Sequence, residues 1–217
     1  MIEPIYQGET AVICATGPSV TPEVIEKVSK AKQAGKVRLF GMNMAFSVFD
    51  LDLLHGCNIA FWDHYWDQVK DLRCQTWTTR PELKGKYHGL NYIEERWEDC
   101  LSTDSSYITA HHGSSAQTMG LAYHYGIKAM LLIGFDMRFA GKIDRRHYKE
   151  PRHFHDETPL TEIHWPMTGP NGELTGLIKE FETINPQRLG VSIINCTPNS
   201  AMTCFPMMDL DEALSDL

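Results

Sequence analysis

The sequence predicts a Rossmann-like α/β fold, a doubly wound and mostly parallel sheet with helices on both faces and a lid segment. Short apolar runs alternate along the chain with stretches whose apolar residues recur at helical spacing. Polar residues gather where the apolar runs end, which is typical of the carboxyl edge of a parallel sheet. The 217 residues suit one domain, in which residues 138–172 form the lid or insertion.

The first strand, loop and helix are expected within residues 10–34. Residues 10–15 are apolar and β-branched, as in a buried parallel strand, and Thr21 and Pro22 suit the N-cap and first position of a helix. Such a turn can hold a phosphate on outward-facing backbone N–H groups, although an ordinary turn that needs a glycine has the same pattern. The loop lacks both the Gly-x-Gly-x-x-Gly pattern and the Gly-Lys-Ser/Thr of a P-loop. It consists of Thr16, Gly17, Pro18 and Ser19.

Further strands are expected in the first half of the chain. Asn43 follows a second strand, and Asp63 comes shortly after a third. An aromatic cluster of Trp62, Tyr65 and Trp66 begins a short helix; its rings could stack on a base or sugar, but we expect two of the three in the core. The expected strands are 37–41, 57–61 and, more weakly, 74–78 and 87–93, followed by a polar surface connection at 94–103.

The second half repeats the alternation. Gly113 and Ser114 precede a helix, and the most apolar strand of the chain, residues 129–134, should be central and leads to Asp136. A further strand ends at Asn195, and Asn199 follows in a loop where Pro198 also suits a simple turn. The remaining expected segments are helices at 116–125, 173–185 and 209–217 and the strand at 190–195.

Bulk composition restricts the partners and the compartment. A net charge of −8 argues against general binding to a nucleic acid backbone. No apolar run approaches the roughly 18 residues of a membrane span, and no signal peptide is apparent. The six cysteines are dispersed without a Cys-x-x-Cys pair, which favours reduced thiols in a cytoplasm over a disulfide framework or zinc site. Self-association into a homo-oligomer is left open.

Residues 138–172 show no convincing periodicity and carry six of the 20 Lys and Arg residues. A long irregular segment inside a compact domain is usually functional, often as a lid, and a solvated basic loop is the alternative. His153, His155 and Asp156 could instead form a metal site. Arginine suits a leaving phosphate, and histidine suits a general base because its pKa lies near neutrality.

Six short motifs occur in order along the chain. They are Ala15–Ser19, Met42–Asn43, the aromatic segment after the third strand, His112–Ser115, Leu132–Asp136 and Asn195–Ser200. This order resembles the family-42 bacterial sialyltransferases of lipo-oligosaccharide synthesis. It is also similar to the domain-of-unknown-function 115 proteins, which include archaeal 6-hydroxymethylpterin pyrophosphokinases, and the chain is closest in size to short phage-encoded proteins with the same pattern. The resemblance covers nearly the whole chain, as scattered motifs.

The resemblance implies roles for individual residues. In the sialyltransferases the Gly-Pro-Ser loop and an asparagine after the second strand hold a cytidine nucleotide; Thr16–Ser19 and Asn43 match them here. An asparagine after the third strand contacts the donor there, whereas Asp63 stands in this chain; the pyrophosphokinase-like proteins are commonly acidic at that position, where the side chain could serve a metal. Arg138 stands where tyrosines contact the donor phosphate. The base is a histidine in the following loop, and His155 lies nearest the expected place.

We therefore expect a single nucleotide-binding domain that acts as a transferase with a nucleotide-linked donor, most similar to a nucleotide-sugar glycosyltransferase with an unknown acceptor. The alternatives are a pyrophosphokinase-like phosphotransferase with Mg²⁺ and a non-catalytic nucleotide-binding protein of phage type. The expected location is the cytoplasm of a bacterial or phage-infected cell. The predicted catalytic residues are His155, His153, His147 and Arg138. The predicted nucleotide-binding residues are Thr16, Gly17, Pro18, Ser19, Asn43, Asp63, Gly113, Ser114, Asp136, Asn195 and Asn199.

Overall fold

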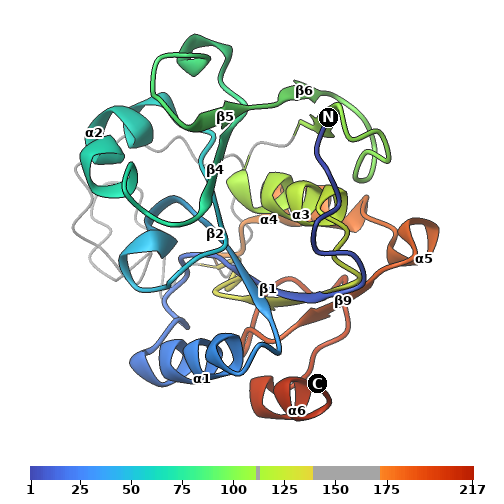
Figure 1. Ribbon diagram of the computed structural model, residues 1–217. Coiled ribbons are helices and arrows are strands. Elements are labelled where there is room, and N and C mark those ends of the chain that lie inside the picture. Colours follow the sequence, from blue (N-terminus) through green and yellow to red (C-terminus); the bar gives the residue numbers. More distant parts are fainter. Residues whose placement is uncertain (111–112, 139–171) are drawn as a thin grey trace.

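A central parallel sheet organises the chain (Figure 1). The computed structural model describes residues 1–110, 113–138 and 172–217. The sheet has seven strands in the order β5-β4-β3-β2-β1-β8-β9, and every neighbouring pair is parallel. The strands are β1 (Thr10–Cys14), β2 (Arg38–Met42), β3 (Leu53–His55), β4 (Gln75–Thr78), β5 (Leu90–Tyr92), β8 (Ala129–Ile133) and β9 (Ser192–Asn195).

Helices cover both faces of this sheet, and each face has its own hydrophobic core. Ile13 and Leu132 belong to the core under α3 and α4, whereas Val12 and Leu131 belong to the core under α1, α2 and α6. Alternate residues of each strand thus enter opposite cores, which explains the unbroken apolar runs. The predicted doubly wound fold is confirmed. The helices are α1 (Pro22–Gln33), α2 (Ile59–Val69), α3 (Ser114–His124), α4 (Thr175–Glu182), α5 (Pro186–Leu189) and α6 (Leu210–Ser215), with 3₁₀ turns at Asn43–Ser47 and Pro81–Leu83.

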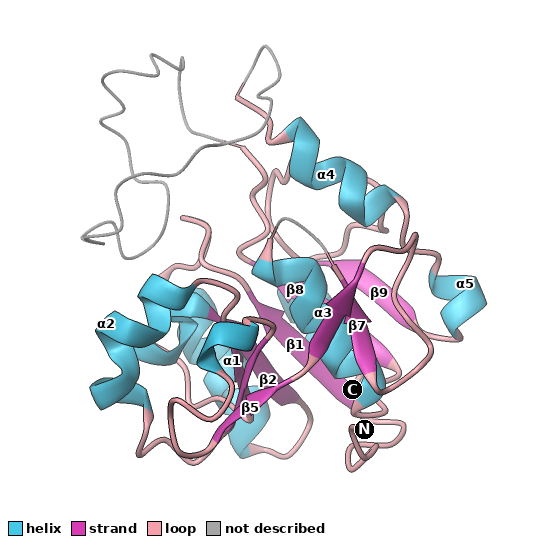
Figure 2. Ribbon diagram, turned by 90° about the horizontal axis from the view of Figure 1, so that it is seen from above, coloured by secondary structure: helices cyan, strands magenta, loops and turns pink. Residues whose placement is uncertain are grey.

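Two features outside the main sheet matter for its surroundings. The polar stretch predicted as a surface connection contains a strand, β6 (Glu94–Arg96), which pairs in parallel with β7 (Tyr107–Thr109) in a second small sheet. Figure 2 shows α2 and β5 toward one end of the molecule and β9 and α5 toward the other. Among the described residues, no helix is long and apolar enough to cross a membrane.

The predicted start of α1 is confirmed. Thr21 is the N-cap, and its side chain accepts a hydrogen bond from the Val24 N–H at 3.4 Å. Pro22 occupies the first turn, and Gly35, just beyond the helix, has a φ of +71°. These residues fix where α1 begins, and therefore where the β1–α1 loop can lie.

The third strand is not where the sequence analysis placed it. Residues 57–61 lead into α2, and the strand is the shorter segment Leu53–His55. The Asn58 side chain caps α2 by accepting from the Ala60 N–H at 2.9 Å. The buried α2 residues Phe61, Tyr65 and Val69 recur every four positions, which is a helical rather than a strand period.

The most apolar strand, β8, is also less central than expected. It is the sixth of seven strands, between β1 and β9, and β2 occupies the middle. It is parallel to β1 as predicted. The apolar run reflects burial on both faces, which β1, β2 and β3 share, and so does not identify the middle strand.

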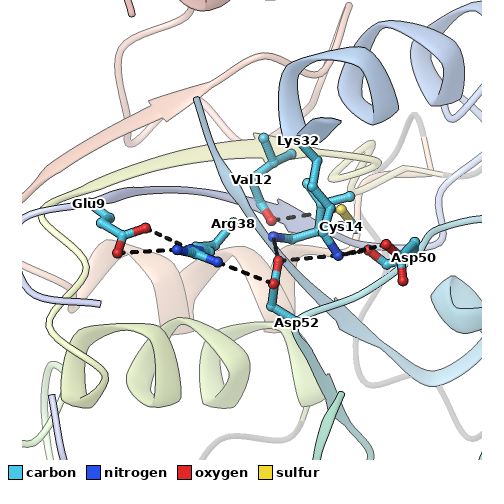
Figure 3. Close-up of polar contacts among 8 residues, drawn as sticks. Glu9, Val12, Cys14, Lys32, Arg38, Asp50 and Asp52 are labelled. Atoms are coloured by element: carbon cyan, nitrogen blue, oxygen red, sulfur yellow. Dashed lines mark hydrogen bonds and ion pairs between the residues drawn. The ribbon is translucent and has the colours of Figure 1, made fainter. Parts of the chain in front are cut away.

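Charged side chains brace the amino edge of the sheet (Figure 3). Arg38, the first residue of β2, lies with its Nε 2.6 Å from Glu9 Oε2 and its Nη1 3.7 Å from Asp52 Oδ1. Lys32 of α1 lies 3.5 Å from Asp52 and 3.0 Å from Asp50. The Asp52 carboxylate also accepts from the Leu39 N–H at 2.7 Å. This network ties the starts of β1, β2 and β3 together and leaves the opposite, carboxyl edge for a ligand.

Candidate functional site

The strand order reverses next to β1, and this identifies the place where α/β sheets bind ligands. From β1 the chain proceeds outward through β2, β3, β4 and β5, and later returns to the other side of β1 through β8 and β9. In α/β sheets the loops that leave the two strands at such a point border the crevice in which a ligand binds. The predicted loop Thr16–Ser19 and the predicted Asp136 are the residues that follow these two strands.

Ser19 and Asp136 join the two sides of this switch point. The Ser19 hydroxyl donates to Asp136 Oδ2 at 2.8 Å, and the Ser19 N–H donates to Asp136 Oδ1 at 3.2 Å. Burial raises the pKa of Asp136, and the two bonds from Ser19 oppose that rise because they favour the ionised form. A carboxylate has about four acceptor positions, so Asp136 can still accept from a ligand hydroxyl or amino group.

Gly17 is required by packing rather than by ligand space. A Cβ atom at this position would lie 1.9 Å from Asp136 Oδ2 and 2.4 Å from the Gly134 carbonyl oxygen. Any side chain at residue 17 would therefore push the two loops apart. A Gly17→Val variant would report on loop packing and cannot by itself locate a phosphate.

The backbone of the β1–α1 loop resembles the ordinary turn, rather than the outward-facing phosphate cradle, of the two alternatives that the sequence left open. Its N–H groups donate to acceptors of the two loops themselves, namely those of Gly17 (to Gly134 O), Ser19 (to Asp136 Oδ1), Val20 (to Gly17 O) and Thr21 (to Ser19 O). Thr16 is buried, and Gly17, Pro18 and Ser19 are half-buried. With a carboxylate beside it, this loop suits the hydroxyl-bearing part of a nucleotide better than its phosphate.

The loop after β9 is bonded to the same region. The Phe135 N–H donates to Thr197 Oγ1 at 2.9 Å, and the Ala201 N–H donates to the Asp136 carbonyl at 2.9 Å. Asn195 is fully buried, accepts from the Thr197 N–H at 3.0 Å and donates to the Met202 carbonyl at 3.0 Å. Asn195 therefore holds the turn, the alternative that Pro198 suggested, whereas Asn199 is exposed.

Left-handed backbone conformations occur after three strands at this edge. Asn43 follows β2 with a φ of +48°, Met137 follows β8 with +51°, and Asn199 follows β9 with +53°. L-residues other than asparagine and aspartate rarely adopt such angles, and strain of this kind clusters at functional sites. The placement of Asn43 and Asn199 agrees with their predicted position at the carboxyl edge.

Ser114 faces inward, toward the loop after β3. Its hydroxyl donates to Cys57 Sγ at 3.0 Å and accepts from the Cys57 N–H at 3.3 Å. Its carbonyl lies 3.3 Å from Nδ1 of His55, the last residue of β3. Gly113 is the N-cap of α3 and has no side chain to cap the helix. Gly113 and Ser114 therefore contribute the backbone N–H groups at the start of α3, whereas the Ser114 hydroxyl is engaged with Cys57.

Asp63 does not join the switch point. It lies on α2, where its carboxylate is 2.6 Å from Lys86 Nζ and accepts from the Tyr87 hydroxyl at 2.6 Å. These bonds hold its pKa below the usual range. Its predicted position directly after the third strand was wrong. That strand ends at His55, and the residues that follow it directly are Gly56, Cys57 and Asn58.

The aromatic cluster near Asp63 is mainly core, as predicted for two of its three members. Trp62 is fully buried and Tyr65 is 7% exposed, whereas the Trp66 ring stacks on Tyr87 with centroids 4.7 Å apart. In the described part of the chain, no three His, Cys, Asp or Glu side chains are grouped to hold a metal ion.

Two polar residues that the sequence analysis overlooked lie at this edge. Arg80 follows β4, and Glu95 of the small sheet lies 3.4 Å from its guanidinium. Arg80 belongs to a strand that was predicted only weakly, and Glu95 to a stretch predicted as surface connection. In a strand, neighbouring side chains point to opposite faces, so the charged residues Glu94 and Arg96 on one face would have indicated that Glu95 points to the other face, toward the protein.

The predicted lid and its histidines are only partly described. Arg138 is exposed, and its backbone forms an antiparallel bridge with Glu173. His147, His153 and His155, and the lid apart from its end residues 138 and 172, lie outside the described residues.

Comparison of the chain with protein-family models, curated proteins and solved structures gave no match.

Proposed function

We propose that the chain is a transferase that uses a nucleotide-linked donor, and specifically a glycosyltransferase resembling the family-42 sialyltransferases. The observation that supports this proposal most directly is the switch point, where the Thr16–Ser19 loop and Asp136 meet. It offers a half-buried carboxylate for a ribose hydroxyl or base amino group, which is a common use of an acidic residue in nucleotide-binding α/β folds. Asn43 and Asn199 follow the neighbouring strands β2 and β9 at the same edge of the sheet.

The proposed reaction requires a base for the acceptor and a stabilised leaving group. The acceptor hydroxyl oxygen attacks the anomeric carbon of the donor sugar while its proton passes to the imidazole of His155, with His153 and His147 as alternatives. The bond between that carbon and the phosphate oxygen breaks, and its electron pair leaves with the nucleotide. A general base of this kind contributes roughly 10²–10⁴ in rate.

The corrected third strand favours glycosyl over phosphoryl transfer. Asp63 suggested a metal-dependent phosphotransferase. However, Asp63 lies on α2, and its carboxylate forms an ion pair with Lys86. The asparagine that follows β3 is Asn58. The sialyltransferase pattern has an asparagine after this strand, so the departure inferred from Asp63 disappears.

A nucleotide panel tests the proposal. We expect at least one of CMP, UDP, ADP and GDP to bind in calorimetric titration, and the matching nucleotide sugar to release it when acceptors are supplied. Asp136→Asn should weaken that nucleotide about tenfold, because it removes a charge-assisted bond. Asp63→Asn is the matched control and should leave affinity unchanged. Weakening by Asp63→Asn alone would move the site to α2, and binding without turnover would favour the non-catalytic alternative.

A further inference from the structure

Arg80 is a preorganised cation at the carboxyl edge of the sheet. It lies two residues beyond Thr78, the end of β4, and its side chain is 34% exposed. Its Nε donates to the Cys57 carbonyl, and its Nη1 lies 3.4 Å from Glu95 Oε1. Among the described residues no partner engages Nη2, so part of the planar fork remains available to a ligand.

Glu95 is fixed from behind. Its Oε2 accepts from the Gln117 side-chain amide at 2.7 Å, and Gln117 is fully buried in α3. The neighbours of Glu95 in β6 are exposed and pair with each other, with Arg96 Nε 2.9 Å from Glu94 Oε1. The short strand therefore directs one carboxylate inward, which holds the Arg80 guanidinium in place.

The start of α3 adds a second source of positive potential near Arg80. Cys57, whose carbonyl holds Arg80, is itself bonded through its N–H and Sγ to Ser114, the first residue of α3. Gly113 leaves the helix without a side-chain cap, and no acidic residue lies in the first turn. The helix dipole therefore favours an anion at the start of α3, near Arg80 at the carboxyl edge of the sheet.

We propose that Arg80 binds a phosphate group of the nucleotide-linked donor, with the start of α3 beside it. This inference rests on the proposed function, and it separates the phosphate from the crevice at Asp136. β4 lies three strands from β1, on the order of 14 Å at the spacing of strands in a sheet, so Arg80 faces the part of the donor beyond the nucleoside. The Gly17 and Ser19 N–H groups donate to Gly134 O and Asp136 Oδ1, which agrees with a phosphate site elsewhere.

Affinity differences between nucleotides and nucleosides test this assignment. For the nucleotide that binds, Arg80→Gln should weaken binding at least tenfold while the affinity of the matching nucleoside changes less than twofold. Glu95→Gln keeps an oxygen that can still accept from the guanidinium and hold it in place, but removes the negative charge that competes with phosphate, so it should strengthen nucleotide binding. A role limited to structure would instead weaken nucleoside and nucleotide equally in both variants.

Controls keep the result interpretable. Arg96→Gln removes an equal charge from the small sheet and should change neither affinity. Arg80→Lys replaces Arg80→Gln if the latter does not fold, and it should retain part of the nucleotide preference. If no nucleotide binds the native chain, the proposed function fails, and line broadening of inorganic pyrophosphate in ³¹P NMR still tests Arg80. Broadening by the native chain that Arg80→Gln abolishes supports the site; equal broadening by both, or none, overturns it.

Discussion

His55 shows how neighbouring groups determine the protonation of one buried side chain. Thr118 Oγ1 donates to the Ser114 carbonyl at 2.7 Å, so its hydrogen is already used. His55 Nδ1, at 3.2 Å from that hydroxyl and 3.3 Å from the carbonyl, must therefore be the donor. In the neutral ring Nε2 is then an acceptor, and it has no partner among the described residues.

Acid should destabilise the protein through His55. Burial, with a smaller contribution from the charge of Arg80, lowers its pKa to about 4. Between pH 6.5 and 4 the unfolded chain binds a proton that the folded chain does not, so stability falls as pH falls, by about 3 kcal/mol in total. His55→Asn should keep a donor near Nδ1 but flatten this dependence, measured by urea unfolding from pH 7 to 4.

Exposed His64 provides the control for that measurement. His64→Asn should retain the full loss of stability on acidification, because it removes an exposed imidazole and leaves the buried His55 ring in place. His124 is also buried, and its lowered pKa contributes in the same direction, so the His55 variant should keep a smaller slope. An unchanged slope in His55→Asn would show that the ring is already charged in the folded protein.

At the scale of elements, the long periodic segments were predictable and the short ones were not. Thr21 and Pro22 fixed the start of α1 from local chemistry alone. β3 has only three residues, Leu53–His55, so its apolar signal was shorter than that of the neighbouring α2. The apolar run at 57–61 resembles a strand when it is read alone. The four-residue spacing that indicates a helix becomes visible only over the longer segment that contains Phe61, Tyr65 and Val69.

The candidate site was predictable where it depends on strand ends and not where it depends on neighbours in space. The sequence placed Ser19 and Asp136 at one edge, but their hydrogen bonds join residues 117 positions apart. The Cβ clash at Gly17 involves the same distant loop. Arg80 and Glu95 act through partners in other elements, and no local pattern specifies such contacts.

The uncapped start of α3 gives a prediction in which stability and binding move in opposite directions. Gly113 has extended backbone angles, and a Cβ atom there would make ordinary contacts, 3.5 Å from Ser115 Oγ and 3.6 Å from Leu177 Cδ2. Gly113→Asp should add a cap and complement the helix dipole, raising the free energy of unfolding by about 0.5–1 kcal/mol. The same carboxylate should weaken nucleotide binding.

Gly113→Ala separates the two effects. It adds a Cβ atom without a cap or a charge, so nucleotide affinity should stay close to that of the native chain. Urea unfolding and calorimetric titration of both variants provide the measurements. Equal affinities of the Asp and Ala variants would remove the start of α3 from the binding site.

For the whole molecule, the described residues form two cores on opposite faces of the sheet, and β8 allows a matched test of their coupling. Leu131 and Leu132 are adjacent and at most 2% exposed, but they enter opposite cores. Each Leu→Ala change should cost about 2–5 kcal/mol. Both variants should unfold in one transition, with fluorescence and circular dichroism coinciding, because β1, β2, β3 and β8 each contribute side chains to both cores.

The exposed Leu72 is the control for these truncations. Leu72→Ala should change the free energy of unfolding by less than about 0.5 kcal/mol, because the side chain is 39% exposed and lies outside both cores. Separate transitions for the two probes would show instead that the two layers unfold independently.

The bridge between Arg138 and Glu173 brings two residues that are 35 positions apart in the sequence side by side. Their backbones are paired in an antiparallel bridge, and the Leu174 N–H donates to the Met137 carbonyl at 2.9 Å, so a two-residue turn could join them directly. A chain in which a short turn replaces the intervening segment would keep the Ser19–Asp136 contact but lose all three histidines proposed as the base. Under the proposed function, such a chain should still bind the nucleotide and have no transferase activity.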